Sequence, residues 1–217
     1  MPLTTTHSRR THLLVLLAVT IMLPLALASH PALSAAKAAA KTSPVALTTE
    51  EAITQITGAD GVLRFEVAED HSRFAWAGDP TLTNGVPAGR TAYIAQGYLY
   101  PAGTLTDANG VNADGTPEFP DKVLGQWLCY GWYLGADDHV RAAPWVSSHL
   151  FNFGSAWGEA TLVSEGFDID DVGVPMERAI AGGNGPYADA RGTQTETNLG
   201  LNATDGLNIR FEVQLAK

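Results

Sequence analysis

The sequence has few cysteines and few basic residues, and each scarcity excludes a feature: internal disulfides in the first case and a nucleic-acid partner in the second. Its 217 residues include one cysteine, Cys129, so no internal disulfide can form and stability has to come from a packed core. Lysine and arginine number 13 against 23 aspartates and glutamates, which gives a formal net charge of −10 at pH 7. Such a chain repels a polyanion and has no basic patch interleaved with aromatic residues, so we expect no nucleic-acid partner.

The N-terminus has the order of an export signal. Arg9 and Arg10 precede an apolar run at 13–28, which is shorter than the ~20 residues that a spanning helix needs. Small residues at 26–28 and at 32–34 offer two cleavage sites. The sequence therefore predicts a signal peptide over 1–34 and a secreted protein with no stable membrane anchor after processing. Both the Sec and the twin-arginine routes stay open, and an uncleaved anchor is the alternative.

Residues 35–58 are rich in alanine, lysine and threonine and are expected to form a lead-in segment. A short helix is expected around 49–56, because Thr48 or Thr49 can cap it and acidic residues follow in its first turn.

After Gly61, turn signals separate short runs that are rich in β-branched and aromatic residues, and no stretch has a helical period. This pattern predicts an all-β domain over 59–217, as a sandwich or a barrel. The expected strands are 62–69, 92–101, 123–134, 145–153, 159–166, 174–182, 192–201 and 207–216.

Two of these runs indicate how the sheet is covered. The last run alternates strictly between apolar and polar residues, which predicts one dry face and one wet face. The run 123–134 is apolar or aromatic on both faces, so its outer face needs a cover as well. Two alternatives can cover that face: a neighbouring subunit in a dimer or trimer, or the N-terminal lead-in segment. The apolar set of the last run is Leu207, Ile209, Phe211, Val213 and Leu215.

No metal and no cofactor is expected from the sequence. The loop at 103–121 is dense in oxygen-bearing side chains, but Val111 and Asn112 stand where a calcium loop needs a ligand and a glycine, so a solvated loop is expected. The histidines beyond the signal show no metal-ligand spacing. They are His71, His139 and His149.

A glycine-rich segment at 177–192 is the most informative part of the chain. Gly182, Gly183 and Gly185 can supply the positive φ of a tight reversal between two strands. The order Gly-Gly-x-Gly, an aromatic residue and then Ala-Arg-Gly resembles the signature of the allene oxide cyclase and dirigent barrel superfamily. The resemblance extends from about Gly61 to the end and is closest to bacterial exported members. It implies an eight-stranded antiparallel β-barrel.

The resemblance also implies a function. Such a protein would be a secreted barrel that binds a hydrophobic or aromatic small molecule, with a cofactor-free cyclase-like or isomerase-like activity or stereochemical steering of an intermediate. A non-catalytic ligand carrier or structural module is the alternative. Glu177 matches a glutamate of dirigent proteins, whereas Met176 stands where their arginine belongs and Arg178 is one position off.

Allene oxide cyclases place a glutamate and a cysteine in the cavity, and Glu66 and Cys129 resemble those two residues. Both are therefore expected to be catalytic and to share one cavity. The alternation of side chains along a strand argues against an inward Glu66, because Phe65 and Val67, which are apolar, would then face outward. The residues expected to bind the substrate are Trp127, Tyr133, His149 and Phe151.

Overall fold

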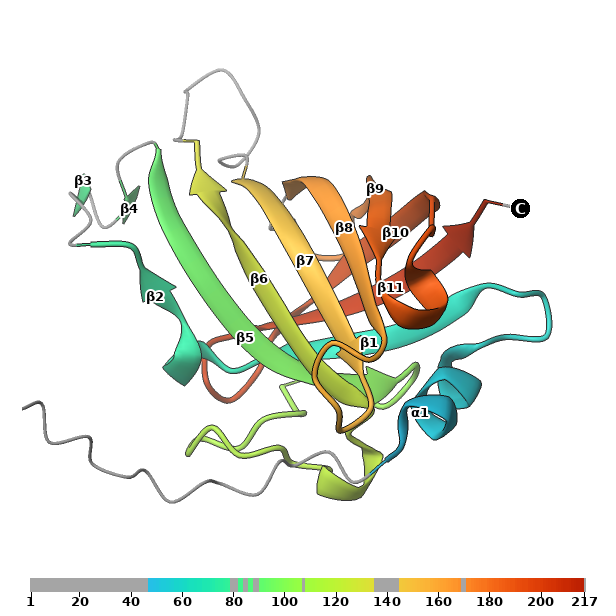
Figure 1. Cartoon of the computed structure of the whole chain (residues 1–217). Coiled ribbons are helices and arrows are strands. Elements are labelled where there is room, and N and C mark those ends of the chain that lie inside the picture. Colours follow the sequence, from blue (N-terminus) through green and yellow to red (C-terminus); the bar gives the residue numbers. More distant parts are fainter. Residues whose placement is uncertain are drawn as a thin grey trace, which may run out of the picture. The chain divides into compact units, whose positions relative to one another are not determined.

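The computed structural model describes residues 47–78, 82–83, 86–87, 90–106, 108–134, 145–168 and 171–216. The expected signal peptide and His139 lie outside these residues. Eight long antiparallel strands form a sheet that closes on itself (Figure 1). Closure comes from β1, which pairs with β11 on one side and with β5 on the other. None of the helices within the described residues is both long and apolar enough to cross a membrane.

The barrel strands follow the expected runs closely. They are β1 (Leu63–Glu69), β5 (Thr91–Pro101), β6 (Gly125–Tyr133), β7 (Trp145–Phe153), β8 (Thr161–Asp168), β9 (Pro175–Gly183), β10 (Gly192–Leu201) and β11 (Leu207–Leu215). The short elements are β2 (Ala75–Trp76), β3 (Leu82–Thr83), β4 (Val86–Pro87) and the 3₁₀ helices η1 (His71–Arg73), η2 (Pro120–Lys122) and η3 (Gly185–Tyr187). The all-β barrel fold is confirmed. β2 continues beyond β1 along the same neighbour, β5.

The expected helix is α1 (Thr49–Ile56), and its start shows why it forms. The Thr48 hydroxyl accepts a hydrogen bond from the Glu51 backbone N–H, and the Glu51 carboxylate accepts one from the Thr48 backbone N–H at 2.9 Å. This reciprocal capping box satisfies two backbone donors that would otherwise have no partner.

One end of the barrel interior is a cluster of phenylalanine rings. The ring centroid of Phe65 lies 4.9 Å from that of Phe151 and 5.4 Å from that of Phe211. Ala52 and Ile56 of α1 belong to the same buried core. Each ring that is removed from water contributes about 1.5–3 kcal/mol, so this end is closed by apolar packing. The expected dry face of β11 is confirmed here, because Phe211 and its alternate neighbours point inward.

The loop between β5 and η2 is packed rather than solvated, which corrects the expectation for 103–121. Leu105 and Val111 are buried against Ala68 and Tyr100, on the outer face of β1 and β5. The Tyr100 hydroxyl donates a hydrogen bond of 2.7 Å to the Gly110 carbonyl. The loop thus forms a second, smaller apolar core outside the barrel wall.

The outer face of β6 keeps exposed aromatic side chains. Tyr130 and Trp132 are 42% and 50% exposed, and Ile94 on the neighbouring β5 is exposed as well. Residues 47–58 therefore do not cover this face. A subunit contact here stays a prediction.

The glycine turn has the conformation that the sequence indicated at two of its three glycines. Gly182 and Gly185 have φ of 147° and 53°, and η3 begins at Gly185. Gly185 also packs so closely that a Cβ there would collide with the carbonyl oxygen of Glu159. The turn directs Tyr187 into the core, where its ring lies 5.9 Å from that of Phe153.

We expect Gly185→Ala to lower the free energy of unfolding by about 1–3 kcal/mol, because it adds both an unfavourable φ and a backbone collision. Gly103→Ala is the matched control, since Gly103 has a φ of 81° but open space around its Cβ position. Urea unfolding of both variants measures the difference. Equal losses would show that the close approach to Glu159 contributes nothing.

Candidate functional site

A pocket of about 370 Å³ opens into the barrel from the end where β1 and β8 finish and β5 and β7 begin. Aromatic and acidic side chains are prominent in its lining. The aromatic ones are Phe74, Trp76, Tyr93, Trp127 and Trp145. The acidic ones are Glu69, Asp168, Glu196 and Asp205. No lysine or arginine is among its lining residues in the described part of the chain.

The aromatic side chains form a continuous wall. Trp76 stacks on Trp145 with centroids 5.8 Å apart and an interplanar angle of 17°. Tyr93 meets Trp145 edge to face at 4.9 Å and stacks on Phe74 at 5.8 Å. Trp76 and Phe74 reach this wall because η1 and β2 turn the chain back along β5 directly after β1. The wall offers flat apolar faces to a planar ligand.

Behind the pocket lies a buried guanidinium, that of Arg178 on β9. It forms an ion pair with Asp168 and donates hydrogen bonds to the backbone carbonyls of Ser147, at 2.7 Å, and Phe167, at 3.2 Å. Its Nε lies 3.8 Å from a carboxylate oxygen of Glu196. Burial lowers the pKa of Arg178, and the charge of Glu196 opposes that effect. The ion pair of Arg178 with Asp168 is therefore largely shielded from water on the inner wall of the barrel.

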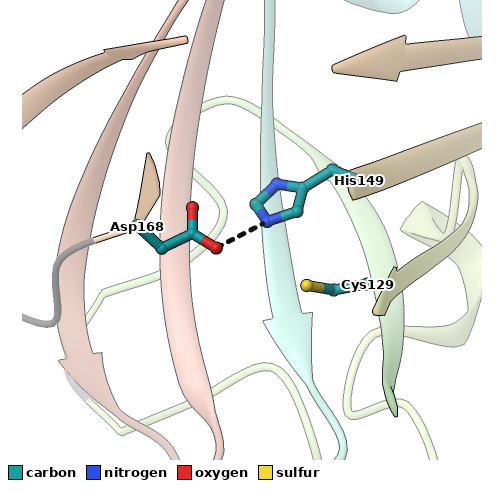
Figure 2. A group of neighbouring side chains, drawn as sticks. All are labelled: Cys129, His149 and Asp168. Atoms are coloured by element: carbon teal, nitrogen blue, oxygen red, sulfur yellow. Dashed lines mark ion pairs between the residues drawn. The ribbon is translucent and has the colours of Figure 1, made fainter. Parts of the chain in front are cut away.

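Three side chains with metal-binding or proton-transfer chemistry converge at the pocket wall (Figure 2). One of them, Asp168, is the ion-pair partner of Arg178. The sulfur of Cys129, a ring nitrogen of His149 and a carboxylate oxygen of Asp168 all lie within 4.8 Å of one another. His149 Nε2 is 3.5 Å from Asp168 Oδ2, and the Cys129 sulfur is 3.4 Å from the Tyr93 hydroxyl.

Burial sets the protonation of two of these groups. It lowers the pKa of His149 well below 6.5, with the Arg178 charge adding to the effect, so the imidazole is neutral at pH 7. It raises the pKa of Cys129 to about 12, so the free side chain is a thiol rather than a reactive thiolate.

Glu66 lies elsewhere, which corrects the expectation that it shares a cavity with Cys129. Phe65 and Val67 fill the interior, so alternation turns Glu66 to the outer face of β1. There its carboxylate accepts hydrogen bonds from Arg210 Nε at 3.1 Å and from the Leu105 backbone at 2.7 Å. Its position gives a catalytic role no geometric support.

The structure brings some of the other expected site residues together and separates the rest. Cys129, Trp127 and His149 line the pocket. Phe151 belongs to the phenylalanine cluster, and Tyr133 is buried with its ring centroid 4.8 Å from that of Trp145. Their roles in binding or catalysis stay predictions.

Sequence reasoning missed the acidic groups of the pocket and the buried arginine behind it. Glu69, Asp168, Arg178 and Glu196 all stand on inner-face positions of their strands. A signal was present for Arg178, because it alternates in register with Ile180, which is an apolar core residue. A charged residue in phase with an apolar face indicates a buried polar site.

No protein-family model matches the sequence, and no curated protein matches it. Solved structures do match. The pterocarpan synthase dirigent protein PsPTS1 aligns at 17% identity over 70% of this chain and 91% of its own, with a TM-score of 0.50. The pterocarpan synthase dirigent protein GePTS1 aligns at 17% identity over 70% and 81%, with a TM-score of 0.48. A pyocyanin demethylase aligns at 15% identity over 71% and 99%, with a TM-score of 0.46.

At such identities a likeness concerns the fold alone. The match to PsPTS1 agrees with the expected fold, an eight-stranded antiparallel barrel.

We expect Arg178→Met to lower the free energy of unfolding by about 3–5 kcal/mol, because it leaves the Asp168 carboxylate unpaired in a buried site. Arg64→Met is the matched control, since Arg64 forms its ion pairs with Asp60 and Glu212 at the surface and its loss should cost far less. Urea unfolding followed by tryptophan fluorescence measures both. A cost for Arg178→Met no larger than that of the control would contradict the buried pair.

Proposed function

We propose that this protein binds a planar aromatic small molecule that has a positive charge, within the barrel pocket. The main support is the composition of the pocket lining: among the residues that the structure describes, aromatic faces stand beside four carboxylates, and neither lysine nor arginine takes part. A volume of about 370 Å³ suits a ligand of two or three fused rings.

The charge of the ligand follows from the pocket. Glu69, Asp168 and Glu196 are largely buried. Arg178 pairs with Asp168 and lies 3.8 Å from Glu196, whereas Glu69 lies 3.8 Å from His71. Negative charge in a low-dielectric site is costly unless a cation compensates it. Aromatic faces add to the attraction, since a cation over a ring gains about 0.5–2 kcal/mol. Trp76 and Trp145 are placed to supply those faces.

Binding alone would make the protein a non-catalytic carrier. The second candidate function is a cyclase-like or isomerase-like activity on the bound molecule. The observation that favours chemistry is the presence of Asp168 and His149 at the same wall, where a carboxylate and a neutral imidazole can exchange a proton with a bound molecule. Mass spectrometry of a copurified ligand separates the two: a carrier leaves it unchanged on incubation, whereas an enzyme converts it.

The binding proposal is tested with two probes of the same size, N-methylquinolinium and neutral 4-methylquinoline, at pH 8. We expect the cation to bind at least about tenfold more tightly, followed by quenching of tryptophan fluorescence. Trp145→Ala should weaken both probes, because it removes the centre of the aromatic wall. Trp157→Ala is the control, since Trp157 is exposed and does not line the pocket.

The contribution of charge is isolated by Glu69→Gln. This change should reduce the preference for the cation and leave the neutral probe unaffected. Glu177→Gln removes the same charge from the exposed outer face of β9 and should change neither. Equal affinity of the two probes for the unaltered protein would overturn the proposal of a cationic ligand.

Export and self-association are proposals as well. The predicted signal supports secretion, and the exposed aromatic residues on the outer face of β6 support a contact between copies.

We expect protein from culture supernatant to begin at a residue within 29–42, as measured by its intact mass. We also expect it to form a dimer or trimer, as measured by native mass spectrometry. Retention of residues 1–28, or a monomer at micromolar concentration, would contradict the respective proposal.

A further inference from the structure

We propose that Cys129, His149 and Asp168 form a binding site for a divalent metal ion of the zinc class, with its open coordination positions facing the barrel pocket. Their donor atoms come from three consecutive strands, β6, β7 and β8. Cys129 and His149 are directly opposite each other in the β6–β7 pairing, and Asp168 ends the next strand. Figure 2 shows the three side chains directed toward one common region.

The separation of the donor atoms suits a tetrahedral ion. Zinc bonds of about 2.3 Å to sulfur and about 2.0–2.2 Å to nitrogen and oxygen place neighbouring ligand atoms roughly 3.3–3.7 Å apart. His149 Nε2 and Asp168 Oδ2 already stand at 3.5 Å. The Cys129 sulfur lies within 4.8 Å of the other two donor atoms, so it has to move only a short distance to reach a shared ion. A rotation about the χ1 torsion of Cys129 can supply that movement.

The surroundings of His149 orient it as a ligand. Its Nδ1 has no hydrogen-bond partner among the described residues and lies 3.8 Å from a carboxylate oxygen of Glu196. If Nδ1 holds the proton, Glu196 faces that N–H and the Nε2 lone pair faces Asp168. In that tautomer, a cation between Nε2 and the Asp168 oxygen, which stand 3.5 Å apart, would remove the repulsion between the two electron-rich atoms. A carboxylate behind a metal-bound histidine is the usual second partner in such sites.

Asp168 and Cys129 are positioned by their own neighbours. The Ser147 hydroxyl and the Arg178 guanidinium both hold the Asp168 carboxylate in place. The Tyr93 hydroxyl lies 3.4 Å from the Cys129 sulfur and can donate to a thiolate there. Each of the three donors therefore has a polar group that fixes or stabilises its binding form.

The charge balance favours the ion in spite of Arg178. Asp168 and Glu196 flank the guanidinium, and Glu69 adds a third carboxylate in the same pocket, so negative charge exceeds positive charge. Binding would convert the Cys129 thiol to a thiolate and release its proton to solvent, because zinc-class ions bind the deprotonated sulfur. Soft sulfur with imidazole and one carboxylate disfavours magnesium and calcium, which prefer oxygen ligands.

Cobalt(II) is the probe for this site, because a thiolate–cobalt bond gives a charge-transfer band in the near ultraviolet. We expect about one equivalent to bind per chain, with that band and with the visible bands of a tetrahedral ion, and Zn²⁺ should displace it. Since Cys129 is the one cysteine of the chain, the sulfur band has a single source. Calorimetry in two buffers should show about one proton released per ion at pH 7.

Variants separate this site from adventitious binding. Cys129→Ser should remove the sulfur band, and Asp168→Asn should weaken binding by at least about tenfold. Glu196→Gln should weaken it about 10–100-fold through the orientation of His149. His71→Ala is the control, since His71 pairs with Glu69 at the pocket mouth and is not a proposed ligand. Thermal unfolding of each metal-free variant shows whether it is folded.

Several outcomes would overturn the proposal. They are the absence of a one-to-one complex, a complex without the sulfur band, an octahedral visible spectrum, or loss of the complex in His71→Ala. If Cys129→Ser fails to fold, the sulfur band and the proton release of the unaltered protein still decide the outcome. Binding of N-methylquinolinium is measured separately in metal-free protein, so failure of one proposal leaves the other standing.

Discussion

The pairing of β1 with both β11 and β5 is the constraint on which the rest of the structure depends. It closes the sheet, so every strand residue must face either the interior or the outside, and alternation decides which. Phe65 and Val67 occupy the interior because burying their apolar surface is favourable, and Glu66 is then committed to the outer wall. The same rule places His149 and Arg178 inside, although both are polar.

Most of the fold was predictable because its signals are local. Period-two alternation, turn glycines and the Thr48 cap each act over a few residues, and the eight strands and α1 follow them. Glu66 is the residue whose position departs from what the resemblance implied. The apolar pattern of β1 argued for an outward Glu66, and that physical argument was correct, whereas the analogy to the cyclase glutamate was not.

The site was much less predictable, because its residues are neighbours only across strands. Cys129 and His149 are twenty positions apart in sequence yet opposite in the sheet, and Asp168 reaches them from the end of β8. Metal-ligand spacing along the chain has no meaning for such an arrangement. No sequence pattern revealed the role of Gly166 either. Because it has no side chain, it leaves room for the aliphatic part of Arg178, and a Cβ atom at position 166 would lie 3.3 Å from the Cγ atom of Arg178.

The position of the phenylalanine cluster beyond the inner end of the pocket also bears on how such a barrel can evolve. Phe65, Phe151 and Phe211 supply packing at one end, whereas Trp145 and Glu69 line the other. Substitutions at the mouth can therefore alter what is bound while the packed end continues to maintain the fold. A scaffold divided in this way tolerates drift in specificity, and descendants with unrelated ligands can retain one architecture long after their sequences have diverged.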